Sequence, residues 1–292
     1  MGHHHHHPSE KNLRTAFFLN LAFTIVELVG GLWVNSVAIL SDAIHDLGDC
    51  LSLGSSLYLE KLAKKSPDSK YSFGYRRFSL LGALINSLVL ILGSIWVIKE
   101  AIIRLVQPEP SNAQGMILLA IFGLAINGYA AWKVSHGKTM NERVISWHLV
   151  EDVLGWAAIL VGAVILLIVK SPYIDPILSL AITCFILWNV FKRLQETVFL
   201  FLQGQPKDVS KSEIEGKILE LEGVESVHQT HIWSLDGEHH VFTTHVKLTA
   251  EISPSKILEV KTKIRKVLLE YPFVHYTIET ESAEEICELT KN

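Results

Sequence analysis

Long apolar segments alternate with short polar loops from residue 12 to residue 201. A transmembrane helix needs about 20 predominantly apolar residues, and each of these segments is at least that long. The pattern therefore predicts an α-helical membrane protein with six transmembrane helices embedded in a lipid bilayer. We expect these helices at residues 12–34, 37–60, 77–104, 114–135, 144–169 and 174–201.

The pattern changes near residue 205 to shorter elements of mixed polarity. Two amphipathic helices and three β-rich runs are predicted in the order helix, strand, strand, helix, strand. This αββαβ order is typical of a small α+β domain with its helices on one face of a sheet. The predicted helices cover residues 211–223 and 253–271, and the predicted strands cover residues 224–234, 239–249 and 273–280.

The charge distribution supports a division of the chain at this point. Residues 207–292 hold 10 Lys/Arg and 16 Asp/Glu, whereas the rest of the chain holds 16 and 14. We therefore expect a membrane domain over residues 9–205 and a separate acidic domain over residues 206–292. Residues 1–8 (MGHHHHHP) are interpreted as an expression tag, so their five histidines carry no functional information.

The composition narrows the functional classes. The chain is 49% hydrophobic and 19% charged, below the roughly 25% charged residues of a soluble domain, which excludes disordered, collagen-like and coiled-coil proteins. A net charge of −4 gives no reason to expect nucleic acid. The three cysteines lie far apart, which excludes a disulfide framework and a CxxC zinc ribbon. We expect no organic cofactor.

Basic residues near the predicted helices indicate the orientation in the membrane. They are numerous before the first helix, between the second and third, between the fourth and fifth, and near the end of the sixth. The opposite side has only Lys99, Arg104 and Lys170, which we expect to snorkel from helix ends. Both termini and residues 206–292 should therefore be cytoplasmic.

Ionisable residues inside two predicted membrane helices are the strongest functional signal. Such residues cost several kcal/mol unless they are paired or hydrated. A His and an Asp four residues apart share one helix face, and this HxxxD pattern occurs in both helices. Two imidazoles and two carboxylates suit a tetrahedral zinc site, whereas an all-oxygen set would favour Mg²⁺, Ca²⁺ or Mn²⁺. The candidate ligands are His45, Asp49, His148 and Asp152.

Other polar residues in these helices have alternative interpretations. Asp42, Asp46 and Glu151 either line an entrance or second shell of the site or face water near a helix end. A polar cluster also binds helices together in many membrane bundles, which is the simplest alternative for the whole set. Asp175 is predicted to cap the helix that follows it.

The sequence resembles the cation diffusion facilitator family, and within it the zinc-transporting branch. The resemblance extends over nearly the whole chain after the tag, and its motifs occur in order at the family spacing. They are residues 36–43 (SVAILSDA) leading into His45xxxAsp49, residues 71–77 (YSFGYRR), His148xxxAsp152, residues 173–177 (YIDPI) and residues 227–235 (VHQTHIWSL).

The resemblance implies a homodimer of six-helix protomers with a cytoplasmic ferredoxin-like domain. It implies metal efflux from the cytoplasm driven by inward proton flow. The four intramembrane candidates match the metal site of the family, and His45 at the first position resembles the zinc-selective members.

The sequence departs from the family pattern in two loops. Tyr71 and Tyr75 stand where some members have the histidines of a second metal site, so we expect no metal at Asp68. The turn between the fourth and fifth helices is short and has only His136, unlike the long His-rich loop of eukaryotic vesicular members. A prokaryotic inner-membrane protein is therefore expected.

Histidines are also dense in the predicted cytoplasmic domain. Three of them fall on the three predicted strands and match family positions that bind cytoplasmic zinc. Residues near the C-terminus are candidates to complete that site from the neighbouring protomer. A polar strand surface without metal is the alternative. The candidate ligands are His228, His245, His275, Glu281 and Cys287.

These observations predict a Zn²⁺/H⁺ antiporter that works by alternating access around the His₂Asp₂ site. Cd²⁺, Co²⁺, Ni²⁺ and Fe²⁺ are alternative substrates, since the Irving–Williams order gives ligand chemistry little selectivity among them. A membrane-anchored metal sensor is the second alternative. An intramembrane zinc enzyme is disfavoured, because there is no HExxH motif and no ligand position is left for water. We therefore expect a transporter rather than an enzyme.

Overall fold

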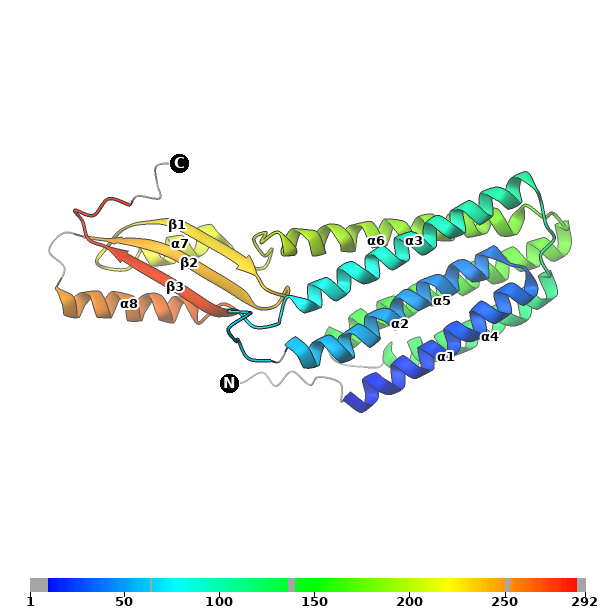
Figure 1. Cartoon of the computed structure of the whole chain (residues 1–292), viewed down its shortest axis with the longest axis horizontal. Helices are drawn as coiled ribbons and strands as arrows, with labels where there is room; N and C mark the ends of the chain where they lie inside the picture. Colours follow the sequence, from blue (N-terminus) through cyan, green and yellow to red (C-terminus); the bar gives the residue numbers. More distant parts are fainter. Residues whose placement is uncertain (1–9, 64, 136–139, 250–252, 288–292) are drawn as a thin grey trace. The chain divides into compact units, whose positions relative to one another are not determined.

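A computed structural model of the chain describes residues 10–63, 65–135, 140–249 and 253–287 (Figure 1). The chain divides into two compact units. The first contains the chain up to Tyr58 together with Gly82–Leu194, and the second contains Leu59–Leu81 and the chain from Gln195 onward. The predicted division into residues 9–205 and 206–292 follows a different line and stays a prediction.

Six long helices form the membrane-spanning part of the protein. Five of them contain stretches long and apolar enough to cross a membrane. The remaining helix, α2, is also long, at 27 residues, but it carries three aspartates. The largest difference from the predicted bounds is four residues, at the start of α5, where residue 144 was expected. The helices are α1 (Glu10–Val34), α2 (Val37–Ala63), α3 (Phe78–Val106), α4 (Ala113–Ser135), α5 (Met140–Val169) and α6 (Ile174–Phe201).

Glycines allow these helices to pack closely. A Cβ atom at Gly123 on α4 would lie 2.2 Å from the ring of Trp156 on α5, and Trp156 is only 2% exposed. Gly48 on α2 leaves room for Leu90 on α3 in the same way. Because lipid supplies no hydrophobic force between helices, such small-to-large packing is a main source of their association. This packing holds α2 and α5, the helices that carry the candidate metal ligands, close to their neighbouring helices.

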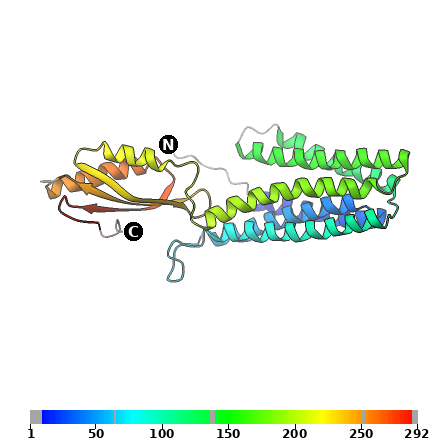
Figure 2. The same ribbon diagram turned by 90° about the horizontal axis from the view of Figure 1, so that it is seen from above.

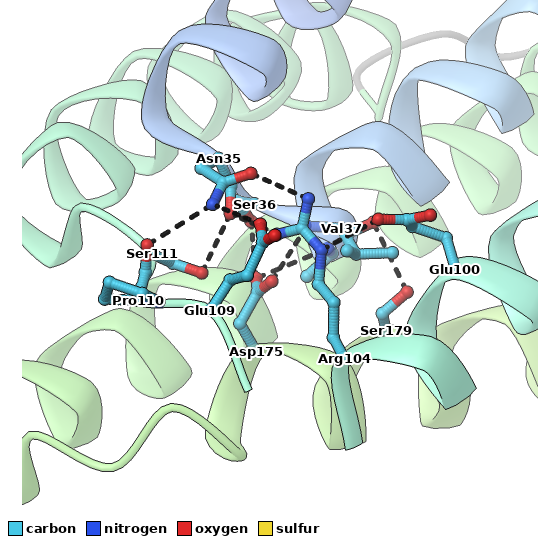
Figure 3. Close-up of polar contacts among 11 residues, drawn as sticks. Asn35, Ser36, Val37, Glu100, Arg104, Glu109, Pro110, Ser111, Asp175 and Ser179 are labelled. Atoms are coloured by element: carbon cyan, nitrogen blue, oxygen red, sulfur yellow. Dashed lines mark hydrogen bonds and ion pairs between the residues drawn. The ribbon is translucent and has the colours of Figure 1, made fainter. Parts of the chain in front are cut away.

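Asp175, at the start of α6, caps α2 rather than its own helix (Figure 3). Its carboxylate accepts a hydrogen bond from the backbone N–H of Val37 at 2.8 Å and another from the hydroxyl of Ser36. The first N–H groups of a helix have no partner within the helix and carry the positive end of its dipole, so a buried carboxylate suits them. The prediction that Asp175 caps the helix following it was therefore wrong.

Arg104 forms the other half of this polar cluster. It is 7% exposed and donates hydrogen bonds to the backbone oxygen and to Oδ1 of Asn35, both at 2.7 Å. Its Nε atom also donates to Glu100 at 3.0 Å (Figure 3). Arg104 thus holds the α1–α2 turn instead of snorkelling as expected, because Asn35 at φ 53° presents two oxygens to one guanidinium.

The second unit contains the predicted αββαβ domain, made of α7 (Lys211–Leu219), β1 (Val224–Ser234), β2 (His240–Leu248), α8 (Pro254–Leu268) and β3 (Phe273–Glu281). The sheet order is β1-β2-β3, with β1 antiparallel and β3 parallel to β2. Ser253 caps α8, accepting a hydrogen bond from the backbone N–H of Lys256. The fold class is confirmed as a helical membrane protein with a small α+β domain.

One face of this sheet is covered by both helices (Figure 2). The core consists of apolar residues of α7 and α8 packed against those of the strands. Because successive strand residues point to opposite faces, this arrangement leaves the other face for polar side chains, among them His228 and His245. The buried side chains of the core include Ile214, Ile218, Phe242, Val246, Val260, Ile264 and Leu268.

Candidate metal centres

The structure brings three of the four intramembrane candidates together between α2 and α5. The Nε2 atom of His45 lies 3.9 Å from Oδ2 of Asp49, one turn further along α2, and 3.7 Å from Oδ1 of Asp152 on α5. One ligand atom from each side chain lies within 4.8 Å of the others. These side chains are 12–19% exposed, so the group is largely shielded by the helices but still accessible.

The fourth candidate is His148. It belongs to α5, four residues before Asp152, but its side chain lies outside the described part of the structure. One imidazole and two carboxylates already form a set of hard and borderline ligands that suits zinc. Cys50 does not join this set: its Sγ atom lies 3.3 Å from the amide nitrogen of Asn20 and 3.5 Å from the hydroxyl of Thr24, both on α1.

Further carboxylates are buried around this group. Asp42 is 5% exposed and its Oδ1 atom would lie 3.3 Å from a Cβ atom at Gly155, so it packs against α5. Asp46 is 6% exposed, Glu151 is half-buried, and Glu27 on α1 is 1% exposed. The sequence of α1 is apolar on all sides, so it does not indicate whether Glu27 is buried among the helices or faces lipid. Such a concentration of carboxylates requires either protons or cations to compensate its charge.

A second group lies on the open face of the sheet. His228 on β1 pairs directly with His245 on β2, and their rings are 5.6 Å apart. Glu281 at the end of β3 bridges them: one carboxylate oxygen lies 3.1 Å from Nε2 of His228 and the other lies 2.8 Å from Nδ1 of His245. The Sγ atom of Cys287 lies 3.5 Å from the same Nδ1 atom. Ligand atoms of all four residues lie within 4.8 Å of one another.

The charge of Glu281 is held by its neighbours. Burial raises the pKa of this carboxyl, but its hydrogen bonds with His245 and Cys287 and the nearby His228 outweigh burial and keep the pKa below its ordinary value. An ionised carboxylate, two imidazoles and a thiol are the ligand types of protein zinc sites. All four of these candidate ligands lie together within one chain, so the group does not need a residue from a neighbouring protomer.

The structure does not bring His275 to this group. In the parallel pairing of β2 with β3, His275 lies beside Val241, while Glu279 lies beside His245. His275 is thus four residues along the sheet from the other histidines, and its ring contacts Phe73 instead, with a centroid separation of 5.5 Å. Strand identity was predictable, but the register that separates His275 from His245 was not.

Hydrogen bonds to the carboxylate of Asp68 hold the loop that precedes α3. Asp68 accepts hydrogen bonds from the backbone N–H groups of Lys70 and Tyr71 at 2.8 and 2.9 Å, and from the hydroxyl of Tyr75 at 2.7 Å. The Tyr75 hydrogen bond and then the two backbone hydrogen bonds lower the pKa of Asp68. Within the described residues, no group of three or more candidate ligands includes Asp68.

A bundle of membrane-crossing helices with metal-ligand side chains at its centre is typical of a metal transport protein. Comparison with known proteins gives the family. The cation efflux transmembrane domain family matches residues 13–202, and the cytoplasmic domain family of cation efflux proteins matches residues 206–283. The chain belongs to the cation efflux, or cation diffusion facilitator, family and is a metal cation efflux transporter rather than an enzyme.

Individual relatives match over almost their full length. A cadmium, cobalt and zinc/H(+)-K(+) antiporter of Bacillus velezensis is 32% identical over 97% of this chain and 93% of its own. The zinc transporter ZitB of Pectobacterium atrosepticum is 33% identical over 96% and 89%. The metal cation efflux system protein CzcD of Cupriavidus metallidurans is 33% identical over 97% and 90%.

Proposed function

We propose that this protein exports Zn²⁺ from the cytoplasm in exchange for protons, by alternating access around His45, Asp49, His148 and Asp152. The observation that carries the proposal is the convergence of His45, Asp49 and Asp152 from two helices within 4.8 Å. The names of the relatives, which include zinc transporters and an antiporter that uses H⁺, support the substrate and the coupling.

Exchange follows from the chemistry of the ligands. A carboxylate binds zinc only when it is ionised and an imidazole only when it is neutral, so zinc and protons compete for the same atoms. Zinc that enters from the cytoplasm displaces protons. When the site faces the other side, proton binding to a ligand weakens the site and releases zinc. The buried carboxylates Glu27, Asp42 and Asp46 surround the route with negative charge that favours cations.

The types of the four proposed ligands support the metal preference. Two imidazoles with two carboxylates fit tetrahedral Zn²⁺, while Cd²⁺, Co²⁺, Ni²⁺ and Fe²⁺ remain alternative substrates of the same site. The two named functions of the Bacillus and Pectobacterium relatives, cadmium, cobalt and zinc antiport and zinc transport, fall within this range.

We also propose the arrangement around this activity. The protein is a homodimer in the inner membrane with both termini in the cytoplasm, its membrane domain covering residues 9–205 and its cytoplasmic domain residues 206–292. In the cytoplasmic domain, His228, His245, Glu281 and Cys287 bind zinc and signal its concentration to the transport domain. His275 is not included, since it lies four residues away along the sheet.

The compact ligand group of the cytoplasmic domain also favours a second function, that of a membrane-anchored metal sensor. The sensor function and the transport function predict different effects of mutation. In a sensor, alanine at His245 would abolish the response to metal, whereas alanine at Asp49 would not. Two half-buried carboxylates and a histidine between α2 and α5 have no role in an anchor, which favours transport.

The proposed function is tested by zinc uptake into proteoliposomes with and without an imposed pH gradient. Wild-type protein should take up zinc only when the gradient drives proton exchange, and Asp49→Ala should lose this flux. Glu196→Gln is a matched control, since Glu196 is an exposed carboxylate on α6 that pairs with Lys207. Zinc uptake that is independent of the gradient, or undiminished in Asp49→Ala, would reject the proposal.

A further inference from the structure

A cavity of about 430 Å³ lies within the second unit, and none of the proposed metal ligands lines it. Its walls come from the loop that precedes α3, the first turn of α3, the last residues of α6 and the end of β1. The lining is mainly aromatic and aliphatic. The apolar lining residues include Phe73, Phe78, Leu81, Phe201 and Trp233.

The loop that forms one wall is held in a defined conformation. Asp68 closes it through three hydrogen bonds, and Gly74 at φ 75° provides the turn that a Cβ atom would strain. Phe73 packs edge-on against Trp233 of β1, with ring centroids 6.4 Å apart. The cavity is therefore part of a fixed surface rather than a gap beside a mobile segment.

Three cationic side chains also line this cavity: Lys70, Arg76 and Arg77. Arg76 lies 3.7 Å from Asp236, a carboxylate that also contacts His239 at 2.8 Å. Among the described residues, neither Lys70 nor Arg77 forms an ion pair, and Arg77 is half-buried. A guanidinium taken partly out of water with no carboxylate beside it favours a bound anion.

The position of the cavity restricts the source of that anion. The apolar membrane-crossing stretch of α3 begins at Phe78 and that of α6 ends at Phe201, and both residues line the cavity. It therefore lies where the hydrocarbon core meets water, the level at which aromatic side chains are enriched in membrane proteins. A free phosphate ion gains nothing from aromatic and aliphatic walls, whereas a phospholipid places its phosphate on the arginines and its acyl chains on the apolar surface.

We propose that this cavity is a binding site for an anionic phospholipid. Arg77, with Lys70 and Arg76, holds the headgroup phosphate, and Phe78, Leu81 and Phe201 contact the first part of the acyl chains. Basic pockets beside transmembrane helices are suited to anionic headgroups for the same electrostatic reason. The inference goes beyond the proposed transport function and does not depend on which metal is carried.

The test counts lipids retained by the full-length protein, using native mass spectrometry after purification with phosphatidylglycerol or phosphatidylcholine. Wild-type protein should retain phosphatidylglycerol in preference. Arg77→Gln removes a cation that forms no ion pair in the described structure and should weaken retention about fivefold, the factor that corresponds to about 1 kcal/mol per surface cation. Arg193→Gln is the matched control, because Arg193 is an exposed arginine on α6 outside the cavity.

Two further arms keep the test decisive. Arg77→Lys preserves the charge and should retain most of the lipid, even if Arg77→Gln alters the stability of the protein. Equal retention of both lipids, or wild-type retention by Arg77→Gln, would overturn the proposal. Displacement by inorganic phosphate alone would indicate a free-anion site instead. A disulfide formed between protomers in a Phe73→Cys variant would show that a second copy covers the cavity, which would also overturn it.

Discussion

The Nε2 atom of His45 on α2 lies 3.7 Å from a carboxylate oxygen of Asp152 on α5. Neither helix holds a metal site by itself, because each HxxxD pattern offers only two ligands. Gly123, which lets α4 and α5 pack closely, also holds α5 in place, so the site depends on helix packing as much as on its ligands.

Removing one of these ligands should abolish transport. Asp152→Asn keeps the shape of the side chain but removes the negative charge that zinc binding needs. Loss of a supporting group around a metal typically costs 10–100-fold in affinity, so loss of a direct ligand should cost at least about 100-fold. The measurement is the zinc concentration that half-saturates uptake into proteoliposomes, with Glu196→Gln as control. A variant that keeps the wild-type value would remove Asp152 from the site.

The packing of α4 against α5 gives a prediction about stability. Gly123→Ala places a methyl group where the ring of Trp156 now lies, and overpacking of this kind costs about 1–3 kcal/mol. The melting midpoint in detergent should fall, and zinc uptake with it. Gly128→Ala on the same helix is the control, since a Cβ atom there meets nothing within 4 Å. Equal melting midpoints of the two variants would contradict the close contact.

The helix cap that Asp175 of α6 provides for α2 gives a second prediction about stability. Asp175→Ala leaves the N–H of Val37 and the hydroxyl of Ser36 without their acceptor, and loss of a helix cap costs about 0.5–2 kcal/mol. We expect a lower melting midpoint, with partial recovery in Asp175→Asn because one acceptor oxygen remains. Glu109→Gln, at an exposed carboxylate near the same turn, should melt as the wild type does.

The pKa of Glu281 leads to a pH dependence. Because the folded state holds this pKa below the ordinary value, the ionised carboxylate stabilises the fold at neutral pH. That stabilisation is complete above the ordinary glutamate pKa of about 4.3 and is lost as pH falls through the lowered value. The protection factors for amide hydrogen exchange in β2 and β3 of the metal-free full-length protein, which correct for the intrinsic exchange rate at each pH, should therefore fall on acidification. In Glu281→Gln the protection factors should be lower already at pH 7 and change less with pH.

Metal binding by the cytoplasmic domain can be followed through its sulfur ligand. Cobalt bound beside Cys287 should show a sulfur-to-metal charge-transfer band, which Cys287→Ser should lose while retaining weaker binding through His228, His245 and Glu281. His231→Ala is the control, since His231 is an exposed histidine of the same strand as His228. An unchanged band in Cys287→Ser would exclude the thiol from the site.

Much of this architecture was predictable because its signals are local. The helix bounds follow from hydrophobic runs, and the HxxxD spacing follows from the geometry of one helix. The errors concern long-range relationships. The position of His275 depends on the register of a parallel strand pair, and the burial of Arg104 and the capping role of Asp175 depend on which helices meet at one end of the bundle. No local pattern of residues specifies these contacts.

The central claim, that transported zinc is held by the intramembrane ligands, is tested most directly by X-ray absorption spectroscopy of zinc-loaded protein. The cytoplasmic site is first disabled with His245→Ala and Cys287→Ser. One zinc ion per protomer should remain, coordinated by four nitrogen or oxygen atoms with no sulfur, and it should disappear when Asp49→Ala is added. Zinc that persists in the Asp49→Ala protein, or that retains a sulfur ligand, would contradict the account.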